Sequence, residues 1–90
     1  MTGRRVYPNT DGSFKLERGD YIHVDGHWYC RVPDDDMNDM DLGCLDKHQI
    51  VEHEDGTISV TPSILQHGRT PDWRPRDWHG FLTRGEWKEC

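Results

Sequence analysis

The chain is punctuated by Asp-Gly turn signals, each set between short runs of β-favouring residues. Two of them are Asp25-Gly26 and Asp55-Gly56. Asp-Gly in this setting is a strong hairpin signal, because a two-residue type I′ turn needs positive φ at both central positions. A fold built from hairpins is therefore predicted.

The strand register follows by counting outward from each turn, since opposed residues in a hairpin share one face. The pairs predicted in this way are Tyr21 with Cys30 and His23 with Trp28 in the first hairpin, and His53 with Ile58 and Val51 with Val60 in the second. In the second hairpin this counting places the apolar residues on one face and the polar residues on the other, as in a half-buried sheet.

A third hairpin is predicted for residues 78–83 and 86–90, which flank Arg84-Gly85. Arginine is a poor residue for positive φ, so this turn is a weaker signal than Asp-Gly. The pairs that the same counting predicts are Leu82 with Trp87, Phe81 with Lys88 and His79 with Cys90.

No stretch of a dozen residues shows the periodicity of about 3.6 that indicates a helix. We therefore expect an all-β fold, a small single domain over residues 1–90 in which about three β-hairpins form a sandwich or a partly open barrel. Residues 1–12 are expected to be loosely ordered, and residues 33–47 and 66–77 to be irregular loops.

The core of this domain is expected to be thin and aromatic. Only 32% of the 90 residues are hydrophobic, and four are tryptophan. A domain of this size buries little more than about 60% of its unfolded surface. Each large aromatic can bury roughly 150–250 Å², so the tryptophans would supply much of the apolar area.

Charge is concentrated in the middle of the chain, where residues 20–60 hold eleven acidic residues against Arg31 and Lys47. Such a segment repels a phosphate backbone, so direct nucleic-acid binding is disfavoured. An acidic face could bind a basic protein instead. The candidate interaction residues here are Asp34, Asp35 and Asp36, and the alternative is a solvated acidic loop that keeps the protein soluble.

A second candidate interaction site combines tryptophan and arginine. Trp73 and Trp78 bracket Arg74 and Arg76 in a segment that contains two prolines. Tryptophan and arginine dominate interface hot spots, because they join a large contact area to directional polar groups. The alternative is that one or both indoles fold back over the core.

Metal chemistry would have to come from scattered cysteines and histidines. The candidate zinc ligands are Cys44, His48, His79 and Cys90, of which His79 and Cys90 are opposed in the predicted third hairpin. Structural zinc needs four such ligands, commonly in closely spaced pairs. The alternative is that a histidine beside a cysteine in a sheet is there for packing. The cysteine count of three is odd and does not indicate a disulfide framework.

Catalytic signals are weak, and the sequence favours a protein that is not an enzyme. The chain has no glycine-rich phosphate loop, and Ser59 and Ser63 do not fit a nucleophile elbow. It also contains no membrane span or signal peptide, so we expect it to stay in the cytoplasm.

Residues 56–65 (GTISVTPSIL) and 78–87 (WHGFLTRGEW) carry a family resemblance, and residues 43–55 are similar as well. The chain resembles a family of small phage, prophage and bacterial proteins that has no agreed activity. The phage branch is sometimes labelled ammonia monooxygenase, but the sequence offers no membrane span or redox-metal ligand set for that label. The bacterial branch carries a cysteine cluster that implies zinc. His79 and Cys90 stand in matching places here, whereas the cluster around Cys44 is missing.

These observations predict a small cytosolic phage or prophage accessory protein that acts as a protein-interaction module. It would bind its partner through the Trp/Arg segment, the acidic face, or both, and a version that uses the acidic face would inhibit a host nucleic-acid-binding protein. The alternative is a zinc-stabilised, or degenerate zinc, structural domain without catalytic activity.

Overall fold

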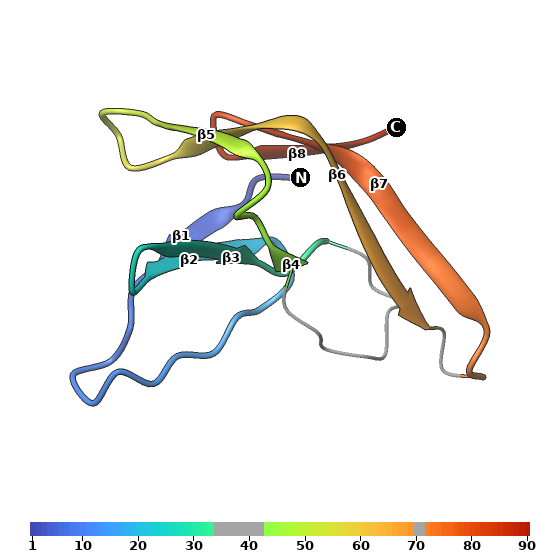
Figure 1. The fold of residues 1–90 in the computed structure, drawn as a ribbon, viewed down its shortest axis with the longest axis horizontal. Coiled ribbons are helices and arrows are strands. Elements are labelled where there is room, and N and C mark those ends of the chain that lie inside the picture. Colours follow the sequence, from blue (N-terminus) through green and yellow to red (C-terminus); the bar gives the residue numbers. More distant parts are fainter. Residues whose placement is uncertain (34–42, 70–71) are drawn as a thin grey trace.

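Two four-stranded sheets pack together as a sandwich in the computed structural model, which describes residues 1–33, 43–69 and 72–90 (Figure 1). The first sheet has the order β1 (Arg4–Val6), β2 (Asp20–Val24), β3 (His27–Cys30) and β4 (Gly43–Cys44). The second has the order β5 (Gln49–Glu52), β6 (Ile58–Arg69), β7 (Pro75–Thr83) and β8 (Glu86–Glu89). The all-β prediction is confirmed, and the sheets are not closed into a barrel.

The first and third predicted hairpins have the expected register. Tyr21 pairs with Cys30 across β2 and β3, and Leu82 pairs with Trp87 across β7 and β8. Both turns have positive φ at their two central residues, with values of 52° and 81° at Asp25-Gly26 and 47° and 79° at Arg84-Gly85. These are two-residue turns of the type I′ class.

The predicted register of the second hairpin is wrong by one residue. Ile50, not Val51, pairs with Val60. The reason is the turn, in which Gly56 N–H donates to the His53 carbonyl at 3.0 Å and His53 N–H donates to the Thr57 carbonyl at 2.8 Å. Only Gly56 has positive φ, as in a three-residue loop with a G1 bulge. A shift of one residue exchanges the faces, so Val51 is 52% exposed.

The three segments expected to be irregular or loose all contain strand residues, and residues 66–77 are mostly strand. β6 and β7 extend through most of residues 66–77, with Gly68 paired with Arg76 and Arg69 with Pro75. Proline is tolerated there because it is the first residue of β7. Near the N-terminus, β1 pairs in parallel with β2, and Trp87 N–H donates to the Met1 carbonyl at 2.8 Å. Within residues 33–47, Gly43–Cys44 form β4.

The core lies between the two sheets and is rich in aromatic residues, as the composition predicts. Its buried members come from both sheets, and Trp78 meets Trp87 edge-on at a centroid distance of 5.4 Å. The core residues are Tyr21, Trp28, Cys30, Val32, Leu45, Ile58, Val60, Ile64, Trp78, Leu82 and Trp87.

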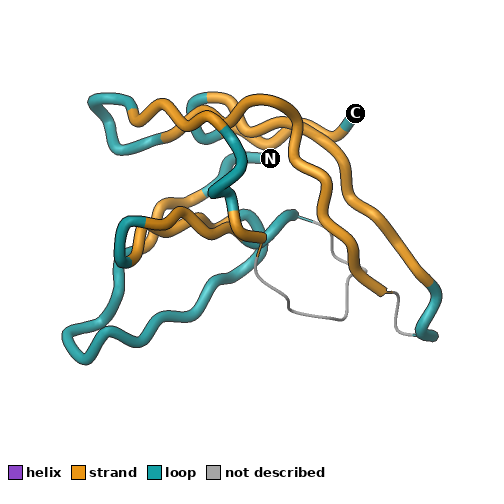
Figure 2. Tube along the Cα trace, viewed as in Figure 1, coloured by secondary structure: helices purple, strands orange, loops and turns teal. Residues whose placement is uncertain are grey.

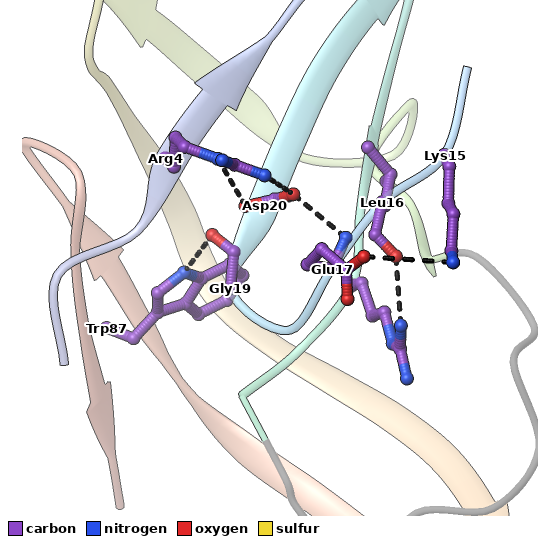
Figure 3. Close-up of polar contacts among 8 residues, drawn as sticks. Arg4, Lys15, Leu16, Glu17, Gly19, Asp20 and Trp87 are labelled. Atoms are coloured by element: carbon purple, nitrogen blue, oxygen red, sulfur yellow. Dashed lines mark hydrogen bonds and ion pairs between the residues drawn. The ribbon is translucent and has the colours of Figure 1, made fainter. Parts of the chain in front are cut away.

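Polar contacts at Gly19 and Asp20 bond the start of β2 to β1 and to the second sheet (Figure 3). The buried Asp20 carboxylate accepts hydrogen bonds from Arg4 Nη2 at 2.9 Å and from the Glu17 N–H at 2.8 Å. One residue earlier, the Gly19 carbonyl accepts a hydrogen bond of 2.9 Å from Trp87 Nε1 of β8. The start of β2 is therefore bonded to both β1 and the opposite sheet.

Candidate interaction site

A long hairpin arm dominates the shape of the second sheet. β6 and β7 run on past the ends of their neighbours, and the arm descends away from the upper layer of the sandwich (Figures 1 and 2). β5 pairs only with the start of β6, from Ile58 to Thr61, and β8 only with the end of β7, from Gly80 to Thr83. The connection at the far end of the arm holds residues 72–74.

Trp73 lies in this connection and is 70% exposed. Its φ is 66°, in the left-handed region that glycine and asparagine adopt most easily. Beside it, Arg74 Nε forms an ion pair with Asp72 Oδ2 at 3.1 Å. The tip of the arm therefore presents one large indole between two oppositely charged neighbours.

Of the other members of the predicted Trp/Arg site, Arg74 lies on the surface and Trp78 in the core. Arg74 is exposed at the tip, and Arg76 lies in β7. Trp78 is only 3% exposed and packs on Trp87, so its prediction as an interaction residue is wrong and it is a core residue. Alternation along β7 is the reason, because residue 78 falls on the face that the opposite sheet covers.

The predicted acidic site, Asp34, Asp35 and Asp36, lies outside the described residues. Three of the acidic side chains that the structure does place lie together at the β5–β6 loop, at the end of the sheet away from the arm. They are Glu52, Glu54 and Asp55.

The four predicted zinc ligands are not gathered into one group. Among the residues that the structure describes, no three histidine, cysteine or acidic side chains meet in a way that could hold a metal ion. Cys44 lies exposed on β4, where it pairs with Tyr29, in the other sheet from His79. The residues as placed therefore do not fit a tetrahedral zinc site, which needs four convergent ligands.

His79 and Cys90 are opposed, as predicted, with the Cys90 N–H donating to the His79 carbonyl at 2.9 Å. The His79 imidazole, however, is bonded through Nε2 to Ser63 Oγ at 2.7 Å. His48 also contacts this residue, with its Nε2 3.2 Å from the Ser63 carbonyl oxygen. Both histidines therefore contact Ser63, which lies in the part of β6 where the β6–β7 register shifts, between Val60 and Ile64.

The third cysteine, Cys30, is fully buried in the core. Burial, with a smaller contribution from nearby Cys44, raises the pKa of its thiol to about 12. A thiol in this state is neither a good nucleophile nor a ready metal ligand, because both roles need the thiolate.

Sequence reasoning missed a polar site at the other end of the second sheet. Glu52, Glu54, Asp55 and His53 line a hollow there together with Arg84 of the β7–β8 turn. Although His53 has no serine beside it in the sequence, its Nε2 lies 2.7 Å from Ser59 Oγ. The contact depends on the bulged loop, so the predicted two-residue turn could not have located it.

Comparisons of the chain with models of protein families, with curated proteins and with solved structures found no match. The resemblance to phage and bacterial proteins stays a prediction. Across the described ranges, no helix is long and apolar enough to cross a membrane.

Proposed function

We propose that this protein is an interaction module that binds another protein through the tip of its β6–β7 arm, with Trp73 as the anchor. The observation that carries the proposal is the combination at Trp73 of 70% exposure and a φ of 66°. A left-handed conformation costs a non-glycine residue about 1–2 kcal/mol. Neither feature helps the isolated domain to fold.

The other three tryptophans show what the fold itself requires. Trp28, Trp78 and Trp87 are 9%, 3% and 4% exposed and all belong to the core. A strained backbone that carries a large exposed side chain is an outlier from which a function can be inferred. An indole inserted into a pocket of a partner would bury a large area, and such residues are typical interface hot spots.

The experiment is affinity capture from a host lysate with the wild-type protein and two variants. Trp73→Asn removes the indole and suits positive φ. Phe81→Ala is the matched control, because Phe81 is an aromatic residue of β7 that is 42% exposed on the body. We expect one specific protein to be retained by wild type and by the Phe81 variant and lost with Trp73→Asn. An unchanged set of captured proteins with Trp73→Asn would contradict the proposal.

The wider setting of the proposal is a phage or prophage accessory protein in the host cytoplasm. The net charge of −6 supports a basic partner, such as a host protein that binds nucleic acid. Binding through Asp34, Asp35 and Asp36 would weaken steeply with salt and with their joint replacement by asparagine. Binding through Trp73 alone would be far less sensitive to salt, because apolar burial is not screened.

A further inference from the structure

At the end of the second sheet away from the arm, two neighbouring turns border an open polar hollow of about 520 Å³. One wall is the β5–β6 loop, which supplies Glu52, His53, Glu54 and Asp55, and the other is Arg84 of the β7–β8 turn. The volume falls within the range of about 300–1,000 Å³ that is common for small-molecule sites. Its lining is polar, so a bound molecule would be held by charge and hydrogen bonds.

Two of the charged groups in this hollow already have partners. Glu52 Oε2 accepts a hydrogen bond of 2.8 Å from Arg5, and Asp55 Oδ1 accepts from the Thr57 N–H at 3.0 Å and from the Thr57 hydroxyl at 2.6 Å. Within the described structure, the side chains of Glu54 and Arg84 make no ion pair or hydrogen bond. One free anion and one free cation therefore line the same hollow from different turns without pairing.

The two walls are held in place by a shared residue, Ser59. Its Oγ accepts a hydrogen bond of 3.0 Å from the Arg84 N–H and lies 2.7 Å from His53 Nε2. Arg84 itself has a φ of 47°, at a turn position that Asn, Asp or Gly would occupy without strain. The arginine is therefore not explained by the needs of the turn, and its backbone is fixed while its side chain is free.

We infer that the hollow binds a small zwitterion whose ammonium and carboxylate are separated by several bonds. The ammonium would lie on the side of Glu54 and the carboxylate would meet Arg84. A simple anion is disfavoured by the three carboxylates of the lining. A simple cation would leave Arg84 opposing it. A metal ion is disfavoured because no three potential ligands converge among the described residues.

The test is an NMR titration of the labelled full chain with a series of ω-amino acids, from glycine through 4-aminobutanoate to 6-aminohexanoate. Butylamine and butyrate serve as the single-charge probes. We expect saturable shifts centred on His53, Ser59 and Arg84 with the longer zwitterions. We expect no saturable shifts with glycine. We also expect butylamine and butyrate to bind more weakly than the longer zwitterions. No saturable shift with any zwitterion, or equal binding of butylamine or butyrate, would overturn the inference.

Variants of the two charged residues test whether both of them bind the zwitterion. Glu54→Gln and Arg84→Asn should each weaken binding of the best zwitterion about fivefold, since an exposed ion pair contributes up to about 1 kcal/mol. Arg84→Asn keeps the turn, because asparagine suits positive φ. Lys88→Gln is the matched control, being an exposed charge on β8 outside the hollow, and should bind as wild type. Loss of binding in only one of the two hollow variants would indicate a single-charge site and overturn the inference.

The inference is independent of the function proposed for the arm. Trp73→Asn, which removes the proposed anchor at the other end of β6 and β7, should leave the titration unchanged.

Discussion

Gly80 is the residue at which the close packing of the second sheet is most demanding. A Cβ at this position would meet the Lys88 carbonyl oxygen and would lie 2.5 Å from Trp78 Cη2 and 2.9 Å from Glu89 Cα. All three belong to ordered strand or core, so none can move cheaply. Because Gly80 has no side chain, the Trp78 indole can lie directly over this position of the same strand.

Gly80→Ala is expected to lower the free energy of unfolding by more than about 2 kcal/mol, because overpacking in a core typically costs roughly 1–3 kcal/mol. Gly12→Ala is the control, since no atom lies within 4 Å of its Cβ position and only its φ of 85° opposes a side chain. That variant should lose about 1 kcal/mol. Urea unfolding of both proteins measures the difference, and equal losses would contradict this account of Gly80.

Cys30 is predicted not to react with thiol reagents in the folded protein. Because burial raises the pKa of its thiol to about 12, a thiol reagent at neutral pH should modify only the exposed Cys44 and Cys90. Mass spectrometry of the labelled native chain should show two additions, and three only after unfolding. Three additions under native conditions would show that Cys30 is accessible.

The same shift predicts the direction of alkaline instability. The buried Cys30 thiol contributes to the stability of the folded protein below pH 9.0, the pKa of this thiol in the unfolded chain. That contribution is lost as the pH rises from 9.0 through the higher pKa of the folded state.

The chain contains three Asp-Gly turns, and they differ in the residue that follows the glycine. Asp11-Gly12 and Asp55-Gly56 are each followed by a hydroxyl residue, Ser13 or Thr57, which bonds the aspartate through both its N–H and its hydroxyl. Asp25-Gly26 is followed by a histidine and forms a two-residue turn. A hydroxyl residue after Asp-Gly therefore accompanies the bulged loop. In the second hairpin this loop accounts for the one-residue difference between the predicted and the observed register.

These bonds predict a loss of stability in acid. Hydrogen bonds from Ser13 and Thr57 lower the pKa values of Asp11 and Asp55 from their ordinary 3.8. A lowered folded pKa gives stability that is present above the unfolded value and is lost as pH falls through the folded one. The free energy of unfolding should therefore decline below about pH 4.

The double variant Asp11→Asn/Asp55→Asn should show a shallower decline in stability over that window. Asp25→Asn is the control, because no hydroxyl follows it, and it should follow the wild-type curve. Thermal melts between pH 2 and pH 6 make the comparison, and identical slopes in the double variant and wild type would rule out this role for the two turns.

Local sequence signals predicted the elements better than their extent. Two registers were predictable because a type I′ turn fixes pairing through residues that are adjacent in the sequence. The length of the arm was not, because Gly68 and the prolines around the tip act as strand breakers in most contexts, while Pro75 begins β7. Trp73 could be identified as a candidate anchor, but the hollow could not, since it needs two turns that are far apart in the sequence.

At the scale of the whole molecule, Arg5 joins the two sheets. Its guanidinium carbon lies 4.9 Å from the ring centre of Trp28 and 5.1 Å from that of Tyr7. Its Nη1 donates across the sandwich to Glu52 at 2.8 Å and to the Gly56 carbonyl at 3.2 Å. The Arg5 side chain is 16% exposed, so these contacts are only partly screened by water.

Arg5→Ala is expected to cost about 2 kcal/mol of stability, the scale of a hydrogen-bonded and stacked charge. Glu52→Gln should cost less than about 1 kcal/mol, because that carboxylate is half exposed. Arg5→Lys keeps the charge but loses the planar stack, and should fall between them. Denaturant unfolding ranks the three variants, and an Arg5→Ala protein as stable as wild type would show that the contacts are incidental.

The central claim is that Trp73 serves binding at the expense of folding, and one pair of measurements on Trp73→Asn tests it most directly. The account predicts opposite changes: a melting temperature equal to or above that of wild type, because asparagine relieves the strain at a φ of 66°, together with at least a tenfold weaker affinity for the captured partner. A lower melting temperature with unchanged affinity would contradict it and would make Trp73 a structural residue.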